Sequence, residues 1–374
     1  MKVGILGGGQ LGRMLALAGH PLGLTCRVLD PGPEACAAAV AEHVAGEYDD
    51  FRVLYDFARG LDVVTYEFEN VPVGSARWLA ERLPVFPPPE ALEVAQDRLA
   101  EKQFLRSLNV PVPRFAPVET EAEFAAALRE IGLPAVLKTR RFGYDGKGQR
   151  VLRAAADAAG AWRVLGGQPL ILEEWVDFER ELSVVAVRGR GGETAFYPLV
   201  ENHHRDGVLR RTVAPAPGLT EELQRKAEAH AARLTERLGY VGVLAVEWFE
   251  RGGELWANEV APRVHNSGHW TIEGAETSQF ENHLRAVLGW PLGPTAPRGC
   301  AEMWNLIGWL PDPAAVCRVP GAHLHVYGKR VRPNRKVGHV TVRADSPARR
   351  AAAARALEGV LREGGKKTQG PHVV

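Results

Sequence analysis

The most informative segment of this 374-residue chain is Lys138-Thr139-Arg140-Arg141-Phe142-Gly143-Tyr144-Asp145-Gly146-Lys147-Gly148-Gln149. A buried strand predicted over 135–138 ends in a lysine, two arginines follow, and a glycine-rich loop carries a second lysine. A nucleoside triphosphate holds about four negative charges, and a closing loop of amides and ammonium groups can cover them and exclude water. The segment therefore predicts a phosphate-binding lid. It is not a P-loop, because G-x-x-x-x-G-K-[ST] is absent, and a solvated basic turn is the structural alternative.

A strand that runs into carboxylates follows the lid: Leu170-Ile171-Leu172-Glu173-Glu174-Trp175-Val176. The backbone of such a strand can recognise an adenine edge, and a carboxylate can bind ribose hydroxyls; a solvated edge strand is the alternative. Glu181 and His204 follow, and side chains of this kind are also common on surfaces. His203 and His204 are adjacent on a predicted strand and point to opposite faces, so we expect no shared metal ion there.

Two further glutamates, Glu247 and Glu259, end the strands of a hairpin predicted around Gly252-Gly253. Acids on neighbouring buried strands need a cation, and Mg²⁺ beside nucleotide phosphates requires only one or two protein carboxylates. A plain two-residue turn sets Glu247 opposite Asn258 and puts Glu259 on the other face. A one-residue bulge would bring Glu259 round to the face of Glu247. The sequence leaves this choice open.

The N-terminus carries a glycine motif, Gly7-x-Gly9-x-x-Gly12, between a strand predicted over 2–6 and a helix predicted over 11–18. Asp30 ends the next strand, which completes the dinucleotide-binding fingerprint. Alternating strands and helices predict a parallel α/β sheet over about the first 90 residues. Helix-start amides bind phosphate or carboxylate equally well. An NAD-dependent oxidoreductase is therefore the main alternative function, and a tight strand-to-helix turn is the structural alternative.

Composition narrows the class of protein. The 46 Lys+Arg and 45 Asp+Glu residues leave a net charge of +1, so we expect no nucleic-acid or membrane partner. Apolar residues make up 45% and charged residues 24%, as in a soluble globular protein, and the length predicts two or three domains. The four cysteines lack C-x-x-C spacing, which favours reduced thiols and a cytoplasmic location.

Four motifs in order resemble one family. They are Gly9-Gln10-Leu11-Gly12-Arg13-Met14, Tyr66-Glu67-Phe68-Glu69-Asn70-Val71, the lid from Gly143 to Gly148, and His265-Asn266-Ser267-Gly268-His269-Trp270. Together they resemble the N5-carboxyaminoimidazole ribonucleotide synthetases, ATP-grasp enzymes of purine biosynthesis, over nearly the whole chain. The resemblance implies an α/β protein: a Rossmann-like parallel-sheet domain (1–95), an ATP-grasp domain (96–295, with a small lobe over 96–170 and a large lobe over 171–295) and a small β-rich C-terminal domain (296–374).

The implied reaction is an ATP-driven carboxylation. Bicarbonate attacks the γ-phosphate of MgATP to give carboxyphosphate, and carbon dioxide or its equivalent passes to the exocyclic amine of 5-aminoimidazole ribonucleotide (AIR). The lid would exclude water from the short-lived carboxyphosphate, and Asp145 could accept a proton from the amine. The resemblance implies ATP, Mg²⁺ and bicarbonate as ligands, a homodimer and a cytoplasmic enzyme.

It also implies a role for each matching residue. ATP would be held by Arg98, Lys138, Gly143, Tyr144, Asp145, Gly146, Lys147, Gly148, Gln149, Glu173, Glu174, Trp175, Val176, Glu181, His204, Asn258 and Glu259, and Mg²⁺ by Glu247 and Glu259. AIR would contact Gln10, Leu11, Glu67, Glu69, Asn70, Arg263, His265, Asn266 and Ser267, with its phosphate on Lys329, Arg335 and Lys336. The carboxyphosphate would be surrounded by Tyr144, Asp145, Lys147, Arg263 and His269.

Two further alternatives remain. Another ATP-grasp ligase, such as a formate-using transformylase or a biotin carboxylase, would share the lid and the hairpin glutamates but differ over 9–14 and 265–270. A nucleotide-sensing protein without catalysis could dispense with Lys138 and both hairpin glutamates, so their presence argues against it.

Overall fold

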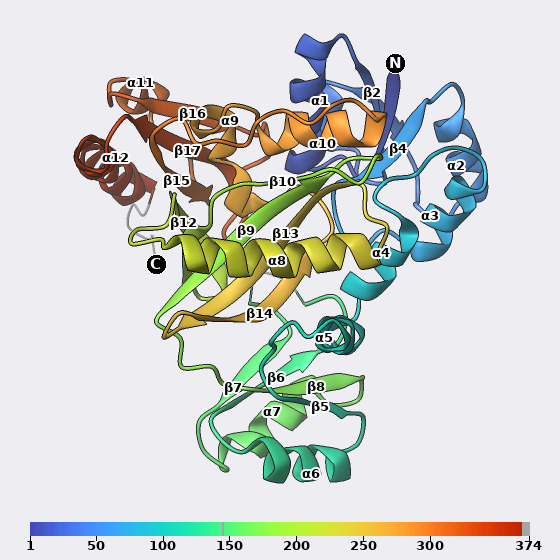
Figure 1. The fold of residues 1–374 in the computed structure, drawn as a ribbon, viewed down its shortest axis with the longest axis vertical. Coiled ribbons are helices and arrows are strands. Elements are labelled where there is room, and N and C mark those ends of the chain that lie inside the picture. Colours follow the sequence, from blue (N-terminus) through green and yellow to red (C-terminus); the bar gives the residue numbers. More distant parts are fainter. Residues whose placement is uncertain (144–145, 369–374) are drawn as a thin grey trace, which may run out of the picture.

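The computed structural model describes residues 1–143 and 146–368 of the chain, with side chains described as far as residue 362. The described residues form three β-sheets of four, nine and four strands (Figure 1). In Figure 1 the N-terminal sheet lies at the upper right, the nine-stranded sheet crosses the middle, and the other four-stranded sheet lies at the lower end. No described helix is long and apolar enough to cross a membrane.

The N-terminal sheet is parallel, as predicted. Its strands are ordered β3-β2-β1-β4, with β1 (Lys2–Leu6), β2 (Thr25–Asp30), β3 (Glu42–Ala45) and β4 (Val63–Tyr66). The flanking helices are α1 (Gln10–Gly19), α2 (Phe51–Ala58) and α3 (Val73–Ala80). Near-continuous apolar strands suit a parallel sheet, because helices can cover both of its faces. Since parallel strands end at one edge, the glycine loop, Asp30 and Glu67 come together there.

The lower sheet is antiparallel and forms a small lobe. Its order is β5-β8-β6-β7, from β5 (Phe115–Val118), β6 (Ala135–Thr139), β7 (Gln149–Leu152) and β8 (Leu170–Glu174). The helices α6 (Glu121–Ile131) and α7 (Asp157–Leu165) pack on one face of it. Helix α6 begins where Thr120 and Glu123 form a capping box. Because β8 pairs with β5 and β6, this lobe extends past the predicted lobe boundary at residue 170.

The nine-stranded sheet spans the large lobe and the C-terminal region. Its path is β14-β13-β9-β11-β12-β15-β17-β16, with β10 paired to β9. The strands are β9 (Arg180–Arg188), β10 (Thr194–Phe196), β11 (Val200–Arg205), β12 (Val208–Ala214), β13 (Gly242–Arg251), β14 (Glu254–Ala261), β15 (Cys300–Ile307), β16 (Ala322–Val326) and β17 (Lys336–Ala344). Pairing of β12 with β15 makes one continuous sheet of the large lobe and the C-terminal region. The domain boundaries predicted after residues 95 and 295 stay a prediction.

Helices cover this sheet where the sequence places apolar stripes. Helix α8 (Glu221–Arg237) begins at its Thr220 cap and buries Leu223, Ala227, Ala231 and Leu234 against β13 and β9. Helix α12 (Pro347–Thr368) buries Leu357 against Val340 and Val342 of β17. The remaining helices are α4 (Pro89–Ala95), α5 (Arg98–Ser107), α9 (Thr271–Gly274), α10 (Gln279–Leu288) and α11 (Pro313–Cys317).

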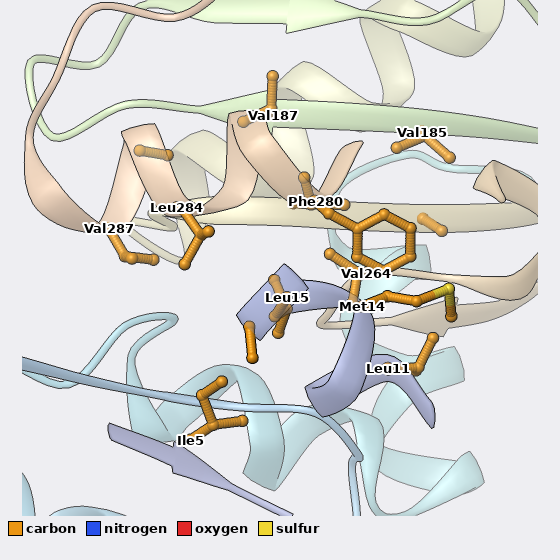
Figure 2. Close-up of a cluster of buried hydrophobic side chains, with 14 of the residues drawn as sticks. Ile5, Leu11, Met14, Leu15, Val185, Val187, Val264, Phe280, Leu284 and Val287 are labelled. Atoms are coloured by element: carbon orange, nitrogen blue, oxygen red, sulfur yellow. The ribbon is translucent and has the colours of Figure 1, made fainter. Parts of the chain in front are cut away.

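One hydrophobic cluster joins the parallel sheet to the nine-stranded sheet (Figure 2). Met14 and Leu15 of α1 lie against Phe280 and Leu284 of α10, and α10 packs on β13 and β9. Each fully buried side chain of this size contributes about 1.5–3 kcal/mol of transfer free energy. The cluster therefore fixes the glycine-loop edge of the first sheet beside the end of the hairpin, where the cavity described below opens.

Candidate active site

A cavity of about 880 Å³ lies where the three sheets meet, a size that suits a nucleotide together with a second substrate. Most of the predicted site residues line it. They are Gln10, Leu11, Glu67, Glu69, Asn70, Arg98, Lys138, Gly143, Gly146, Lys147, Gln149, Glu173, Glu174, Trp175, Val176, Glu181, His204, Glu247, Asn258, Glu259, Arg263, His265, Asn266, Lys329 and Lys336.

Some predicted residues do not line the cavity. His269 is only 1% exposed, with its ring against Phe280 and His339, so it does not line the cavity, and its predicted role beside a reacting group stays a prediction. Ser267 is fully buried and its hydroxyl lies 2.9 Å from His265 Nδ1, which makes it a support for that ring. The lining also lacks Gly148, whose carbonyl accepts from Thr139, and Arg335, which donates to the Arg330 carbonyl. Tyr144 and Asp145 lie outside the described residues.

Cations gather at the small-lobe side of the cavity. Strand β6 carries Lys138, whose Nζ lies 2.9 Å from Glu173 Oε2 on the neighbouring strand β8. Lys102 of α5, which the sequence did not reveal as a site residue, places its Nζ 3.5 Å from the same oxygen. Burial alone would raise the pKa of Glu173, but Lys102, Lys138 and Arg98 lower it to about 2. One carboxylate thus faces three cations, and the excess positive charge suits a polyphosphate.

The lid reaches the cavity from β6. Arg98 Nη2 donates to the Gly143 carbonyl at 3.4 Å, and Arg140 donates to Asp97, the N-cap of α5, at 2.7 Å. Gly146 has φ +75°, and a Cβ there would lie 2.7 Å from the Asp206 carbonyl oxygen of the β11–β12 turn. A left-handed backbone against another chain segment requires glycine. The lid glycine therefore permits close contact with the large lobe.

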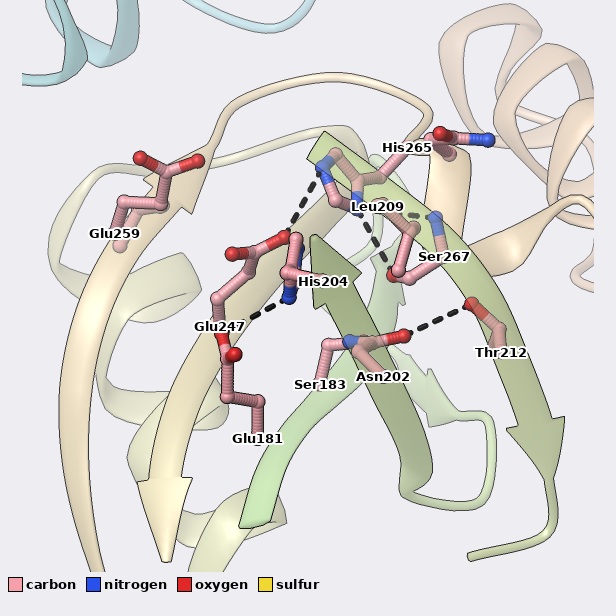
Figure 3. Close-up of polar contacts among 12 residues, drawn as sticks. Glu181, Ser183, Asn202, His204, Leu209, Thr212, Glu247, Glu259, His265 and Ser267 are labelled. Atoms are coloured by element: carbon pink, nitrogen blue, oxygen red, sulfur yellow. Dashed lines mark hydrogen bonds and ion pairs between the residues drawn. The ribbon is translucent and has the colours of Figure 1, made fainter. Parts of the chain in front are cut away.

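The two hairpin glutamates face one another. In the ladder Glu247 pairs with Glu259 and Trp248 with Ala257, so Asn258 is the extra residue of a bulge. The bulge is the alternative that brings Glu259 to the face of Glu247, and Figure 3 shows both side chains on the same side of the hairpin. Burial, and then the charge of Glu259, raise the pKa of Glu247 to about 7. Two carboxylates that repel one another in this way fit a bound cation.

The donor set is suited to Mg²⁺. Within residues 1–143 and 146–368, no group of three or more His, Cys, Asp or Glu side chains is arranged to hold a metal. A site with two carboxylates would be completed by water and phosphate oxygens, which is the usual Mg²⁺ arrangement beside nucleotides. The residues present therefore fit Mg²⁺ that arrives with a nucleotide.

Two histidines flank these carboxylates (Figure 3), and their pKa values are shifted in opposite directions. Burial would lower the pKa of His204, but a 3.0 Å contact with Glu181 and the charges of Glu247 and Glu259 raise it to about 9. His265 lies 3.5 Å from Glu247, yet burial and then Arg263 hold its pKa well below the usual range. His204 is therefore a cation at neutral pH, and His265 is neutral.

An apolar slot lies beside the lid, and sequence reasoning missed it. Val136 and Val151 pair on β6 and β7 and line the cavity, opposite Phe249 of β13. Phe249 stacks on Phe178 with ring centroids 4.8 Å apart. The sequence does contain a signal for this slot: Ala135, Val136 and Leu137 are consecutive apolar residues, so both faces of the strand are apolar. One face covers the small-lobe core and the other is free to contact a planar ring such as a purine.

The glycine motif holds a carboxylate of the chain itself. The N–H groups of Gly9 and Gly12 donate to Glu67 at 2.6 and 2.9 Å, and Gly8 donates to Asp30 at 2.7 Å. Burial raises the pKa of Glu67, while the two glycine amides stabilise its charged form. The anion at this helix start is therefore a side chain, and a dinucleotide pyrophosphate would have to displace it.

Gly7→Ala should test how tightly Glu67 fills this turn. Gly7 has φ +108°, and a Cβ there would lie 2.3 Å from Glu67 Cγ, so we expect a loss of about 3 kcal/mol in the free energy of unfolding. Gly23→Ala is the control, because Gly23 has φ +70° and no described atom lies within 4 Å of its Cβ position; it should cost about 1 kcal/mol. Equal losses in urea unfolding of the two variants would contradict the packing described.

The far end of the cavity combines N-terminal and C-terminal side chains. Gln10 of α1 accepts from Lys329, and Glu69 forms an ion pair with Arg263. Asn266 and Asn305 exchange amide hydrogen bonds of 3.0 and 2.8 Å, which holds the loop after β14 against β15. This end therefore offers lysine, arginine and amide groups to a second, phosphate-bearing ligand.

Comparison with known proteins assigns the family. Three family models match in succession: the ribonucleotide synthetase preATP-grasp domain over 1–96, the ATP-grasp domain over 103–280 and the phosphoribosylaminoimidazole carboxylase C-terminal domain over 301–353. N5-carboxyaminoimidazole ribonucleotide synthase of Pseudomonas aeruginosa is 55% identical, covering 92% of this chain and 94% of that protein. The chain belongs to the N5-carboxyaminoimidazole ribonucleotide synthetase family.

Solved structures of the synthetase family have the same fold. The Thermus thermophilus enzyme is 61% identical with a TM-score of 0.93, covering 96% of this chain and 98% of that one. An Aspergillus clavatus enzyme, solved with ADP and 5-aminoimidazole ribonucleotide, is 31% identical with a TM-score of 0.90 and 98% coverage of both chains. The predicted family, fold class and ligase class are thereby confirmed, and the oxidoreductase alternative is wrong.

Proposed function

We propose that this chain, as a member of the synthetase family, carboxylates AIR to N5-carboxyaminoimidazole ribonucleotide in purine biosynthesis, using ATP and bicarbonate. A bicarbonate oxygen would bond to the γ-phosphorus as the bond to ADP breaks. The AIR amine would then form a C–N bond as the bond between carbon and the phosphate oxygen breaks, releasing phosphate and a proton. The proposal is supported by a cavity that is lined by Lys138 and Arg98 at one end and by Lys329 and Lys336 at the other.

ATP would lie between the lobes. Its adenine would enter the slot of Val136, Val151 and Phe249, and its phosphates would face Lys138 and Arg98 beneath the lid. Phosphoryl transfer depends mainly on positioning and charge neutralisation, and this arrangement provides both without a nucleophilic side chain. Glu247 and Glu259 would hold Mg²⁺, which when bound neutralises phosphate charge. His204, cationic beside Glu181, would add a further positive charge.

AIR would occupy the opposite end. Lys329 and Lys336 line the cavity there and would bind its phosphate, with Gln10 as a hydrogen-bonding partner. Arg263, held by Glu69, lines the same end of the cavity and would face the acyl phosphate. Asp145 stays our prediction for the proton acceptor. The homodimer, the cytoplasmic location and the domain boundaries also stay predictions.

A substrate panel tests the proposal. We expect ADP release by the purified protein to require Mg²⁺ and bicarbonate and to rise at least about ten-fold on addition of AIR, because the acceptor amine draws off carboxyphosphate. Coupled ADP detection measures this directly. Stimulation by formate or glycinamide ribonucleotide in place of bicarbonate and AIR would reassign the protein to another ATP-grasp ligase.

A further inference from the structure

The bulge that turns Glu259 into the cavity is held from outside the sheet by helix α5. Strand β14 is the edge of the nine-stranded sheet, so one side of its backbone has no strand partner among the described residues. Lys102 Nζ donates to the carbonyls of Ala257 at 3.0 Å and Asn258 at 2.7 Å. Glu101 Oε1 accepts from the N–H of Val260 at 2.6 Å. Two consecutive helix residues thus bind the backbone on both sides of Glu259.

Both side chains are buried, which is unusual for charged residues. Lys102 is 0% exposed and Glu101 is 2% exposed. A buried charge is costly unless it is paired and hydrogen-bonded. Lys102 satisfies this through the two carbonyls and through Glu173 at 3.5 Å, the carboxylate that also binds Lys138. Lys102 therefore connects Glu173, at the phosphate end of the cavity, to the strand that carries Glu259.

The bulge itself needs this support. An extra residue in an edge strand leaves its backbone groups without ladder partners, and the strand can pair more regularly by losing the bulge. A regular ladder would set Asn258 opposite Glu247 and rotate Glu259 to the other face. Donors placed on the carbonyls of Ala257 and Asn258, and an acceptor placed on Val260, favour the bulged register alone.

We propose that Lys102 and Glu101 are positioning residues that hold the bulge at Asn258, keep Glu259 facing Glu247, and so set the affinity of this pair for the divalent cation of a bound nucleotide. The inference rests on the proposed function, because it assigns a use to the carboxylate pair. Lys102 does not line the cavity; Glu101 does, but its Oε1 is engaged by the Val260 N–H, so both residues would act on Glu259 through the backbone. Loss of an indirect support of this kind lowers metal affinity by about 10–100-fold.

The test measures ADP binding by calorimetry, with Mg²⁺ and with EDTA, and takes the ratio of the two dissociation constants. Lys102→Met should lower the Mg²⁺ enhancement by about ten-fold or more. Lys226→Met is the matched control, because Lys226 donates to the Gly253 carbonyl at 3.1 Å, at the turn end of the same hairpin. It should keep the wild-type ratio.

If Lys102→Met does not fold, a second pair of variants tests the positioning role. Glu101→Leu removes the acceptor for Val260 and should lower the ratio, whereas Glu101→Gln keeps an acceptor oxygen and should restore it. A wild-type ratio in folded Lys102→Met or in Glu101→Leu would overturn the positioning role while leaving the proposed function intact. A wild-type protein whose ADP binding ignores Mg²⁺ would instead overturn both.

Discussion

Glu259→Gln is expected to lower turnover by at least about a thousand-fold. The substitution removes one of the two carboxylates that would hold Mg²⁺, and Mg²⁺ would supply several kcal/mol of charge stabilisation to the transferred phosphoryl group. The amide keeps the size of the side chain but removes the charge that faces Glu247. The fold should survive, because the substitution removes the repulsion by Glu259 that, after burial, raises the pKa of Glu247. The pKa of Glu247 should therefore fall below about 7 but stay raised, because the side chain remains buried.

Steady-state ADP release and thermal unfolding check both parts of this prediction. Glu254→Gln is the matched control, because Glu254 begins the same strand and its side chain, 60% exposed, pairs with Lys226 away from the cavity. Turnover of Glu259→Gln within about three-fold of the control would mean that the carboxylate pair does not take part in the reaction.

Lys138→Ala should reduce turnover to a similar extent, by about a thousand-fold, because it removes a buried cation from the phosphate end of the cavity. The free energy of unfolding should fall by only about 1–3 kcal/mol, because Glu173 keeps Lys102 as a partner at 3.5 Å. Kinetics and urea unfolding measure the two effects. Lys2→Ala, which removes a surface lysine paired with Glu42, should leave turnover unchanged. Normal turnover in Lys138→Ala would exclude this lysine from the ATP site.

The elements that carry the site could largely be predicted from local sequence. A lysine at the end of an apolar strand, followed by glycines, located Lys138 and the lid, and the N-cap residues Asp97 and Thr220 are local signals for the starts of α5 and α8. Local pattern could not fix the register of the hairpin. A single extra residue decides which face Glu259 occupies, and here that residue is held by Lys102 of a distant helix.

Lys102 shows why such residues escape sequence reasoning. A lysine in a helix is usually solvated, and its complete burial here follows only from how α5 packs on β14. His269 shows the converse: its sequence context predicts a site residue, and the structure buries it. The loop 265–270 is dense in polar groups, yet only His265 and Asn266 line the cavity, whereas His269 is buried against Phe280.

The glycine motif shows a different limit of sequence patterns. Its spacing correctly predicts an anion at a helix start, but the chemical identity of that anion depends on a strand that ends far along the chain. Glu67 follows β4, and β4 lies beside β1 in the sheet. A dinucleotide fingerprint therefore indicates anion binding and does not by itself indicate a nicotinamide cofactor.

If the cavity holds carboxyphosphate beside AIR, one oxygen of bicarbonate must end in the phosphate that is released. With bicarbonate labelled with ¹⁸O at all three oxygens, the bond formed to the γ-phosphorus carries a bicarbonate oxygen, which stays with the phosphate when AIR takes the carbon. Mass spectrometry of the products should find one labelled oxygen in each phosphate released. Unlabelled phosphate accompanying carboxylated AIR would exclude carboxyphosphate as the intermediate.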